Sequence, residues 1–378
     1  MKILLILTVC LFSSIFAEPY MAVRDGIKCS QCHFNKTGGG KRTDFGIAYS
    51  QSTLPTHFLQ TQSDNNFYSS KVSDFISIGA TFRLDDVRKL KYSGSLPSEK
   101  KDSTPKVKVT APAARQTVLR QSNLFFQFDL IPQSFSFYVD YNFTTGNYRE
   151  SFGMFTHSYL NSFVKAGYML LPFGLKFMDD ESFVRTGSGY NFGSTAYAIE
   201  AGIEPGPLSL VINATETAVS QTTAFSQPRW RLGFSNAYNT KKPAILPQGR
   251  VLSKYAIFGG FNIDRFTVMT EFDVIDNPPD TAKENKILNY IPVDAWFGLL
   301  SLDVLATKGI NLKAVYELQQ KDATVSYKKN LEARLTLGIE AFPIQFVQLA
   351  LFYQINEFVP QNAAGNQDQI ISRFNIAF

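Results

Sequence analysis

Apolar and polar residues alternate with a period of two through most of this 378-residue chain, and this alternation restricts the fold more than any other feature. In Phe135–Phe143 every second residue is phenylalanine, valine or tyrosine, and the residues between them include serine, aspartate and asparagine. Phe266–Val274 and Leu331–Ala341 repeat the pattern. Because successive side chains of a strand point to opposite faces, each segment predicts a strand with one apolar and one polar face. We therefore expect an all-β structure from about Phe75 onward.

Two kinds of connection separate the predicted strands. The short turns are Ile131–Ser134, Glu204–Pro207, Asn262–Asp264 and Ala341–Pro343. The long polar connections are roughly 86–115, 171–194, 277–290 and 359–368. Short turns at one rim and long loops at the other are typical of outer-membrane barrels, although many short strands could also form a soluble sandwich. Counting about fifteen strands, with an uncertain one near 239–250, we predict a transmembrane antiparallel β-barrel of about 16 strands, since bacterial barrels have an even number.

Both ends of the chain favour export to the outer membrane of a Gram-negative cell. Lys2, a short apolar core and the small residue Ala17 are typical of a cleaved signal peptide, and the core is too short to span a bilayer. The last segment, Ile370–Phe378, alternates and ends on phenylalanine, which resembles the terminal strand of outer-membrane barrels. We expect a signal peptide at 1–17, a short segment at 18–66 and a porin-like barrel at 67–378.

The net charge of +5 is too small to indicate nucleic acid as a partner. Phenylalanine, with 34 residues, is abundant, as in barrels with aromatic girdles. We therefore expect lipid of the outer membrane to surround the barrel. We expect no nucleic acid as a partner.

The sequence Cys29-Ser-Gln-Cys32-His33 is the motif of this chain that indicates a cofactor. Two thiols at this spacing can each add to a vinyl group of haem, and the adjacent imidazole can then bind the iron. Cys29 and Cys32 are therefore the candidate thioether residues of one covalent haem c, and His33 is the candidate proximal axial ligand.

Other uses of the motif fit less well. Structural zinc needs four ligands, and beyond the motif the chain has only His57 and His157 to add. A redox Cys-x-x-Cys usually opens a helix beside a βαβ unit, which this sequence does not contain. A disulfide between Cys29 and Cys32 remains an alternative. For the sixth iron ligand the candidates are His57, Met21 and His157.

The segment at 18–66 has too few apolar residues to enclose a haem by itself. We expect the barrel to supply the missing burial, with the segment plugging the lumen from the periplasmic side. The run Gly38–Gly40 is interpreted as flexible chain leaving the haem.

The order of signal peptide, Cys-x-x-Cys-His, glycine-rich stretch and barrel resembles the fused monohaem cytochrome c–porins of bacterial outer membranes. This resemblance implies electron transfer between an extracellular donor or acceptor, such as Fe(II), and a periplasmic carrier such as a soluble cytochrome. An enzyme of this kind would be an Fe(II):cytochrome c oxidoreductase. Residues Ala22–Gly40 also resemble a wider set of haem-bearing exported barrels, for which iron need not be the substrate.

Two other functions remain as alternatives. One is a diffusion porin whose haem segment senses, gates or docks a partner, and the other is a soluble periplasmic β protein. Tyr168–Gly174, with Asp179, Asp180 and Phe183–Arg185, also resembles a segment of phosphate-selective porins; a strand that runs into a folded loop would explain the same residues.

Charged residues on the polar face of the predicted strands should line the lumen. They are Asp129, Asp140, Glu271, Asp273, Asp303, Glu317, Glu332, Glu340, Arg231, Lys313 and Arg334. An acidic lumen could admit cations such as Fe(II), but the mixture of signs favours an ordinary salt-bridged lining.

Overall fold

The computed structural model describes eleven stretches of the chain. They are 19–37, 39–56, 68–95, 108–177, 179, 181–191, 194–239, 253–277, 293–323, 327–358 and 365–378. The predicted signal peptide at 1–17, the candidate ligand His57 and all but residue 239 of the uncertain strand near 239–250 lie outside these residues. Within them, no helix has both the length and the apolar character needed to cross a membrane.

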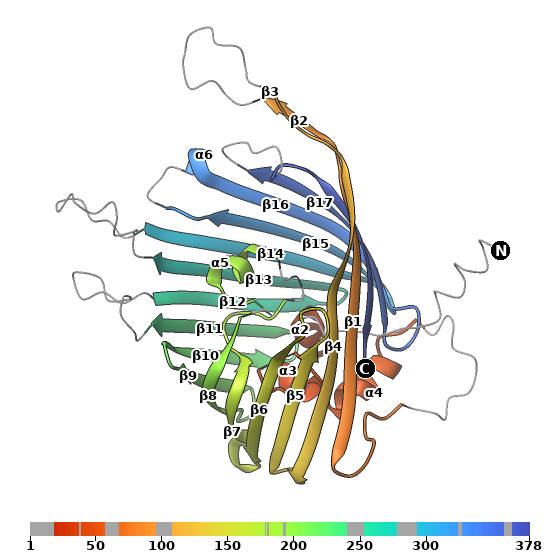
Figure 1. The fold of residues 1–378 in the computed structure, drawn as a ribbon, viewed down its shortest axis with the longest axis vertical. Helices are drawn as coiled ribbons and strands as arrows, with labels where there is room; N and C mark the ends of the chain where they lie inside the picture. Colours follow the sequence, from red (N-terminus) through yellow and green to blue (C-terminus); the bar gives the residue numbers. More distant parts are fainter. Residues whose placement is uncertain are drawn as a thin grey trace, which may run out of the picture.

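Sixteen strands pair in sequence order and close into one antiparallel barrel, as predicted. Their bounds are β1 (Ile76–Lys89), β4 (Ala114–Ile131), β5 (Phe135–Asn142), β6 (Asn147–His157), β7 (Ser162–Leu170), β8 (Thr195–Ile203), β9 (Leu208–Thr215), β10 (Ala218–Gln227), β11 (Trp230–Asn239), β12 (Ser253–Ile263), β13 (Phe266–Asn277), β14 (Val293–Thr307), β15 (Ile310–Gln320), β16 (Leu331–Ala341), β17 (Val347–Phe358) and β18 (Gln369–Ala377). The first and last strands, β1 and β18, close the barrel, with Thr81 opposite Ala377. A separate ribbon of β2 (Tyr92–Ser95) and β3 (Lys108–Ala111) continues beyond β1 and β4 (Figure 1).

The two rims differ as the connection lengths predicted. The rim where β18 ends carries short turns, such as those between β4 and β5 and between β12 and β13. The opposite rim holds the strand ends that the long connections join, although the β5–β6 and β9–β10 turns there are short as well. We call these the short-turn rim and the long-loop rim.

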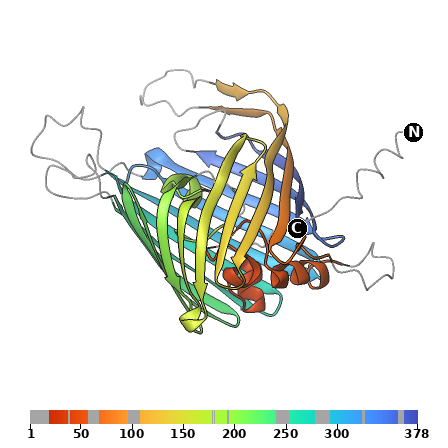
Figure 2. The same cartoon turned by 60° about the horizontal axis from the view of Figure 1, so that its bottom comes forward.

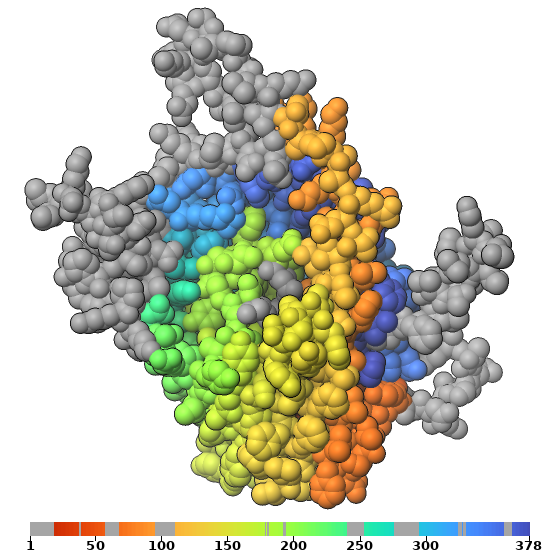
Figure 3. Space-filling view, viewed as in Figure 1, coloured from red at the N-terminus to blue at the C-terminus, as the bar shows by residue number. Residues whose placement is uncertain are grey.

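The two faces of the wall also follow the predicted alternation. On β5, Phe137 is 45% exposed on the outside, whereas Tyr138 and Asp140 are fully buried on the inside. Ile257 on β12 and Phe272 on β13 are likewise exposed, so large apolar side chains cover the outside of the wall. In Figure 3 side chains over β4–β8 form a continuous outer surface.

Inward-facing charges are mostly paired. The pairs include Arg149–Asp140, Lys165–Glu200, Arg185–Glu271, Lys313–Glu340, Arg334–Glu317 and Arg373–Asp85. This arrangement agrees with the salt-bridged lining expected from the sequence rather than with an unpaired acidic interior.

Two segments enter the lumen. Residues 19–56, here called the plug, form α2 (Pro19–Asp25), α3 (Cys29–Cys32) and α4 (Asp44–Ser52) at the short-turn rim (Figure 2). Residues 171–191, here called the lumen loop, follow β7 and include α5 (Phe183–Ser188), which packs on β13–β15. Short pieces of helix, η1 (Tyr159–Asn161) and α6 (Tyr327–Asn330), lie in connections. The folded-loop interpretation of the segment after Tyr168 is therefore correct.

Candidate functional site

The motif forms a single helical turn, α3, inside the plug. The Lys28 amide donates to Gln31 Oε1 at 2.7 Å at the start of the turn, and the His33 amide donates to Cys29 O at 3.0 Å at its end. His33 itself is extended (φ −117°, ψ 140°) and pairs with Arg42 in an antiparallel bridge. Cys29 is partly exposed, Cys32 is buried, and both thiols are free.

The His33 imidazole is buried and held by the backbone. Its Nδ1 lies 3.3 Å from Gly40 O, and when Nδ1–H donates to this carbonyl, Nε2 is left with a free lone pair. Metal-ligating histidines commonly use the second ring nitrogen in this way. Burial, followed by the positive charge of Arg42, lowers the pKa of His33 to about 4. The ring is therefore neutral at physiological pH, which is the form that binds metals.

Cys29, Cys32 and His33 line one cavity of about 440 Å³. Much of its remaining wall is apolar and comes from Pro19, Met21, Ala22 and Ile27. Two thiols and a neutral imidazole beside apolar side chains form the donor set that a covalent haem c requires. Among the residues described, no cluster of three or more His, Cys, Asp and Glu side chains is arranged for a metal ion held by protein ligands alone.

The barrel wall fixes the position of the motif. Ser30 Oγ donates to Glu204 Oε2 at 2.8 Å, in the turn after β8, and Lys28 Nζ donates to Leu208 O at 2.8 Å. From β11, Arg231 Nη1 donates to Cys29 Sγ at 3.4 Å. Residues far apart in sequence thus hold both sides of α3.

The second half of the plug packs against Cys32. Thr43 begins α4, where its hydroxyl accepts from the Gly46 amide at 3.1 Å. The Thr43 amide donates to Cys32 O at 3.0 Å. A side chain at position 46 would overlap this same carbonyl, which explains why a glycine stands there.

Gly39 and Gly40, the described part of the glycine run after the motif, form a packed turn, so the interpretation of these two residues as flexible chain is wrong. Gly39 (φ 89°) and Gly40 (φ 68°) adopt left-handed backbone conformations that favour glycine. At Gly40 an added Cβ would overlap the Tyr138 hydroxyl, which projects inward from β5. This hydroxyl accepts from the Lys41 amide at 3.1 Å. The turn therefore anchors the plug and presents the carbonyl of Gly40 to His33. Gly38 lies outside the described residues.

Replacement of Gly40 by alanine should destabilise the plug by about 1–3 kcal/mol, because it adds strain at positive φ to a clash with Tyr138. Gly146→Ala is the matched control, since Gly146 has nearly the same φ (69°) but no atom within 4 Å of an added Cβ. Limited proteolysis and urea unfolding should separate the two variants. Equal loss in both would show that the Tyr138 contact contributes nothing.

The candidates for the sixth ligand have different positions. Met21 is 1% exposed and lines the same cavity as His33. His157 is exposed at the end of β6, where its Nδ1 accepts from the Tyr159 amide at 3.1 Å, and it is not among the cavity residues. His57 lies outside the described residues. Of the two candidates within the described residues, the structure brings Met21, and not His157, to the cavity of His33.

Two residues that border the motif were not predicted from the sequence. Lys176 of the lumen loop lines the cavity, as does Tyr49 of α4, whose hydroxyl contacts Asp25 and accepts from Arg24 Nη2 at 3.2 Å. Neither belongs to a recognisable pattern, because a loop that folds back into the lumen leaves no periodic signal.

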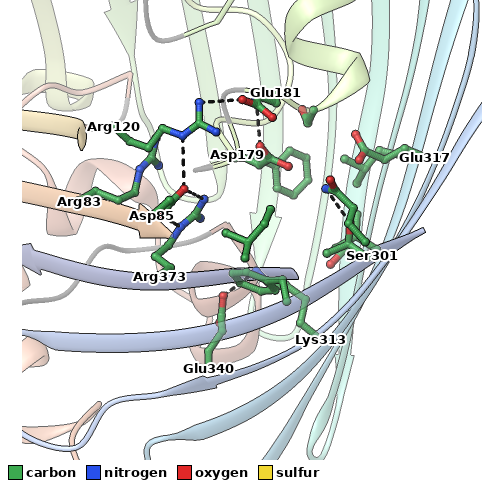
Figure 4. A pocket seen from close by; sticks show the side chains of 18 residues that line it. Arg83, Asp85, Arg120, Asp179, Glu181, Ser301, Lys313, Glu317, Glu340 and Arg373 are labelled. Atoms are coloured by element: carbon green, nitrogen blue, oxygen red, sulfur yellow. Dashed lines mark hydrogen bonds and ion pairs between the residues drawn. The ribbon is translucent and has the colours of Figure 1, made fainter. Parts of the chain in front are cut away.

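A further cavity of about 830 Å³ lies in the lumen between the wall and the lumen loop (Figure 4). Its charged groups pair with one another: Arg120 contacts Glu181 at 2.7 Å and Asp85 at 3.5 Å, and Arg373 contacts Asp85 at 2.9 Å. The lumen next to the lumen loop therefore contains a network of paired charges.

Comparison with known proteins finds no matching family model and no matching curated protein. Solved structures do match. OmpT of Vibrio cholerae has a TM-score of 0.55 and 10% identity, covering 82% of this chain and 100% of its own. The outer membrane channel DcaP of Acinetobacter baumannii has a TM-score of 0.57 and 9% identity, covering 82% and 99%. OmpF of Salmonella typhi, in complex with daunomycin, has a TM-score of 0.55 and 10% identity, covering 80% and 97%.

The barrel has a porin fold. At 9–10% identity the similarity establishes this fold and nothing about the contents of the lumen.

Proposed function

We propose that the protein is an outer-membrane, porin-type barrel that carries one covalent haem c in its plug. In this function it passes electrons between an extracellular donor or acceptor, with Fe(II) as a candidate, and a periplasmic carrier such as a soluble cytochrome. The observation that carries the proposal is the single cavity lined by Cys29, Cys32 and His33.

Membrane insertion is supported by the outer wall. Exposed side chains such as Leu232, Ile257 and Phe272 present apolar surface that lipid would cover. In outer-membrane barrels the short turns face the periplasm, which supports a periplasmic position for the plug. A soluble β protein would not expose such a wall to water.

The residues of the plug have distinct parts in this function. Cys29 and Cys32 would hold the haem through thioether bonds, and His33 would bind its iron through Nε2. The bound haem would supply one-electron redox chemistry. The carbonyl of Gly40 orients the imidazole, and the apolar wall around Met21 limits access of water.

A diffusion porin, with a haem-bearing segment that senses, gates or docks a partner, is the second candidate. The porin fold and its similarity to a protein described as a channel favour this candidate more directly than electron transfer. The plug and the lumen loop weigh against free diffusion, since both occupy the lumen.

Electron transfer can be tested in liposomes that contain the protein and enclose a soluble cytochrome c. A membrane-impermeant Fe(II) complex added outside should reduce the enclosed cytochrome. Vesicles with the Cys29→Ser, Cys32→Ser variant should show only the slow background rate. If both proteins give the same rate while the wild type carries haem, electron transfer is excluded and the diffusion porin is favoured.

A further inference from the structure

The cavity of about 830 Å³ beside the lumen loop, here called the lumen cavity, adjoins another cavity toward the long-loop rim. This outer cavity has about 880 Å³, and its lining includes Lys89 and Phe358 at the ends of β1 and β17. Arg120, Glu181 and Gln354 border both cavities. Arg120 and Glu181 form an ion pair between the wall and the lumen loop (Figure 4), and both side chains are partly exposed. Exposed pairs are weak, so this one is a small barrier to a molecule that arrives from the long-loop rim.

The lumen loop separates the lumen cavity from the cavity lined by the Cys-x-x-Cys-His motif, here called the motif cavity. Lys176 lines the motif cavity, and the next residue, Phe177, lines the lumen cavity. Phe177 belongs to a cluster of buried apolar side chains that also contains Met21 of the motif cavity and Leu299 of the lumen cavity. Such clusters are closely packed, so side chains rather than an open passage lie between the two cavities.

The plug contributes a second part of this partition. Met21 lines the motif cavity, whereas the neighbouring residue Tyr20 contacts two residues of the lumen cavity. The Tyr20 hydroxyl donates to Glu340 Oε2 at 3.0 Å, and Lys313 Nζ lies 4.9 Å from the centre of its ring. A molecule in the lumen cavity would therefore be separated from the motif cavity by single residues of the plug and of the lumen loop.

The lining of the lumen cavity suits an organic ring better than a bare divalent cation. All five of its carboxylates have a basic partner; in addition to the pairs given above, Asp179 lies 3.4 Å from Arg334. Divalent cations need carboxylate oxygens that are available to coordinate them. The apolar residues of the lining are Phe177, Leu299, Val315, Phe352 and Ile371. Apolar walls with a few hydrogen-bonding groups, here Ser301 and Gln354, are typical of sites for small organic molecules.

We propose that the lumen cavity binds a quinone or hydroquinone, which arrives from the long-loop rim and exchanges electrons with the haem across Tyr20 and Phe177. A hydroquinone in this site would give up two electrons, one at a time, to the ferric iron and two protons to water, and would leave as the quinone. Each electron would pass on to the periplasmic carrier before the next one arrives. This inference rests on the proposed function and names the chemical class of its extracellular partner.

Equilibrium dialysis of the purified protein against anthraquinone-2,6-disulfonate tests the binding site. Ser301→Trp should weaken binding roughly tenfold or more, because the indole ring would occupy the cavity. Phe352→Leu keeps an apolar side chain and should weaken binding about threefold through loss of ring contact. The matched control is Ser372→Trp, because Ser372 is exposed on β18 and does not line the lumen cavity. This control should bind the quinone like the wild type.

Stopped-flow absorbance of the haem in liposomes tests the electron transfer. The reduced form of the same quinone and Fe(II)–EDTA, neither of which crosses a bilayer, are added outside in separate experiments. Ser301→Trp should slow reduction by the hydroquinone roughly tenfold, in proportion to its loss of binding. Phe352→Leu should slow the hydroquinone and leave Fe(II)–EDTA unaffected, because the iron chelate has no aromatic ring.

Three results would overturn the proposal. They are absence of quinone binding to the wild type, binding that Ser301→Trp leaves unchanged, and equal slowing of both donors by Phe352→Leu, which would make the cavity a passage without preference for rings. The Cys29→Ser, Cys32→Ser variant should still bind the quinone, since neither cysteine lines the lumen cavity. A wild type that binds quinone but carries no haem would therefore refute the proposed function and leave the binding site standing. Retention of the heat-dependent gel shift shows that each variant is folded.

Discussion

Replacement of both Cys29 and Cys32 by serine should abolish covalent haem staining of the protein and leave its barrel intact. Only a thioether-bound haem survives denaturing electrophoresis, and the two thiols lie on one helical turn at the wall of one cavity. The barrel should persist because its sixteen strands pair with one another independently of the motif. The measurement is a denaturing gel of purified outer membranes, heated and unheated, stained first for haem and then for protein.

Cys10→Ser is the matched control for this experiment. Cys10 is the one cysteine of the chain outside the motif and lies in the predicted signal peptide, so its loss should leave the haem stain unchanged. A wild-type band that shifts on heating but never stains for haem would contradict both the cofactor and the electron-transfer function. It would leave a porin whose motif has another use.

The sequence was sufficient to predict the barrel because a strand encodes its two faces locally. The alternation of Phe137 with Tyr138 and Asp140 placed the correct side chains outside and inside, and the short turn at Ile131–Ser134 marked the correct rim. The exact count was harder, because the segment after Asn239 combines charge, proline and glycine without clear alternation.

The cavity could be predicted only in part. Cys29, Cys32 and His33 are adjacent in sequence, and their spacing is the chemical requirement of haem attachment. Lys176 lines the same cavity from the lumen loop, and Arg231 reaches Cys29 from β11. No local pattern records such contacts.

The glycine run illustrates a different limit. Gly40 is compatible with flexible chain in the sequence, but in the structure its positive φ and the hydroxyl of Tyr138 require a residue without a side chain. Glycine is used both for flexibility and for close approach, and only the neighbouring atoms distinguish the two. Here close approach links the motif to β5.

In planar bilayers the wild-type protein should conduct far less current than a general porin such as OmpF measured under the same conditions. A barrel of sixteen strands is wide enough for an aqueous channel, so low conductance must come from material inside it. The plug supplies that material and is fastened to the wall by buried carboxylates. Glu150 accepts from Asn35 Nδ2 at 2.9 Å, and Glu204 accepts from Ser30 Oγ at 2.8 Å.

Removing these carboxylates in a Glu150→Ala, Glu204→Ala variant should therefore raise the conductance several-fold and make the plug sensitive to protease. Loss of Glu150 also removes the acceptor of the Leu170 amide and a negative charge near Arg149, which further weakens the wall that holds the plug. Asp86→Ala is the matched control, because Asp86 pairs with Arg88 and Arg115 toward the long-loop rim and should not affect the plug. Wild-type conductance equal to that of OmpF would contradict a sealed electron conduit and favour the diffusion porin, since ions would then already pass beside the plug.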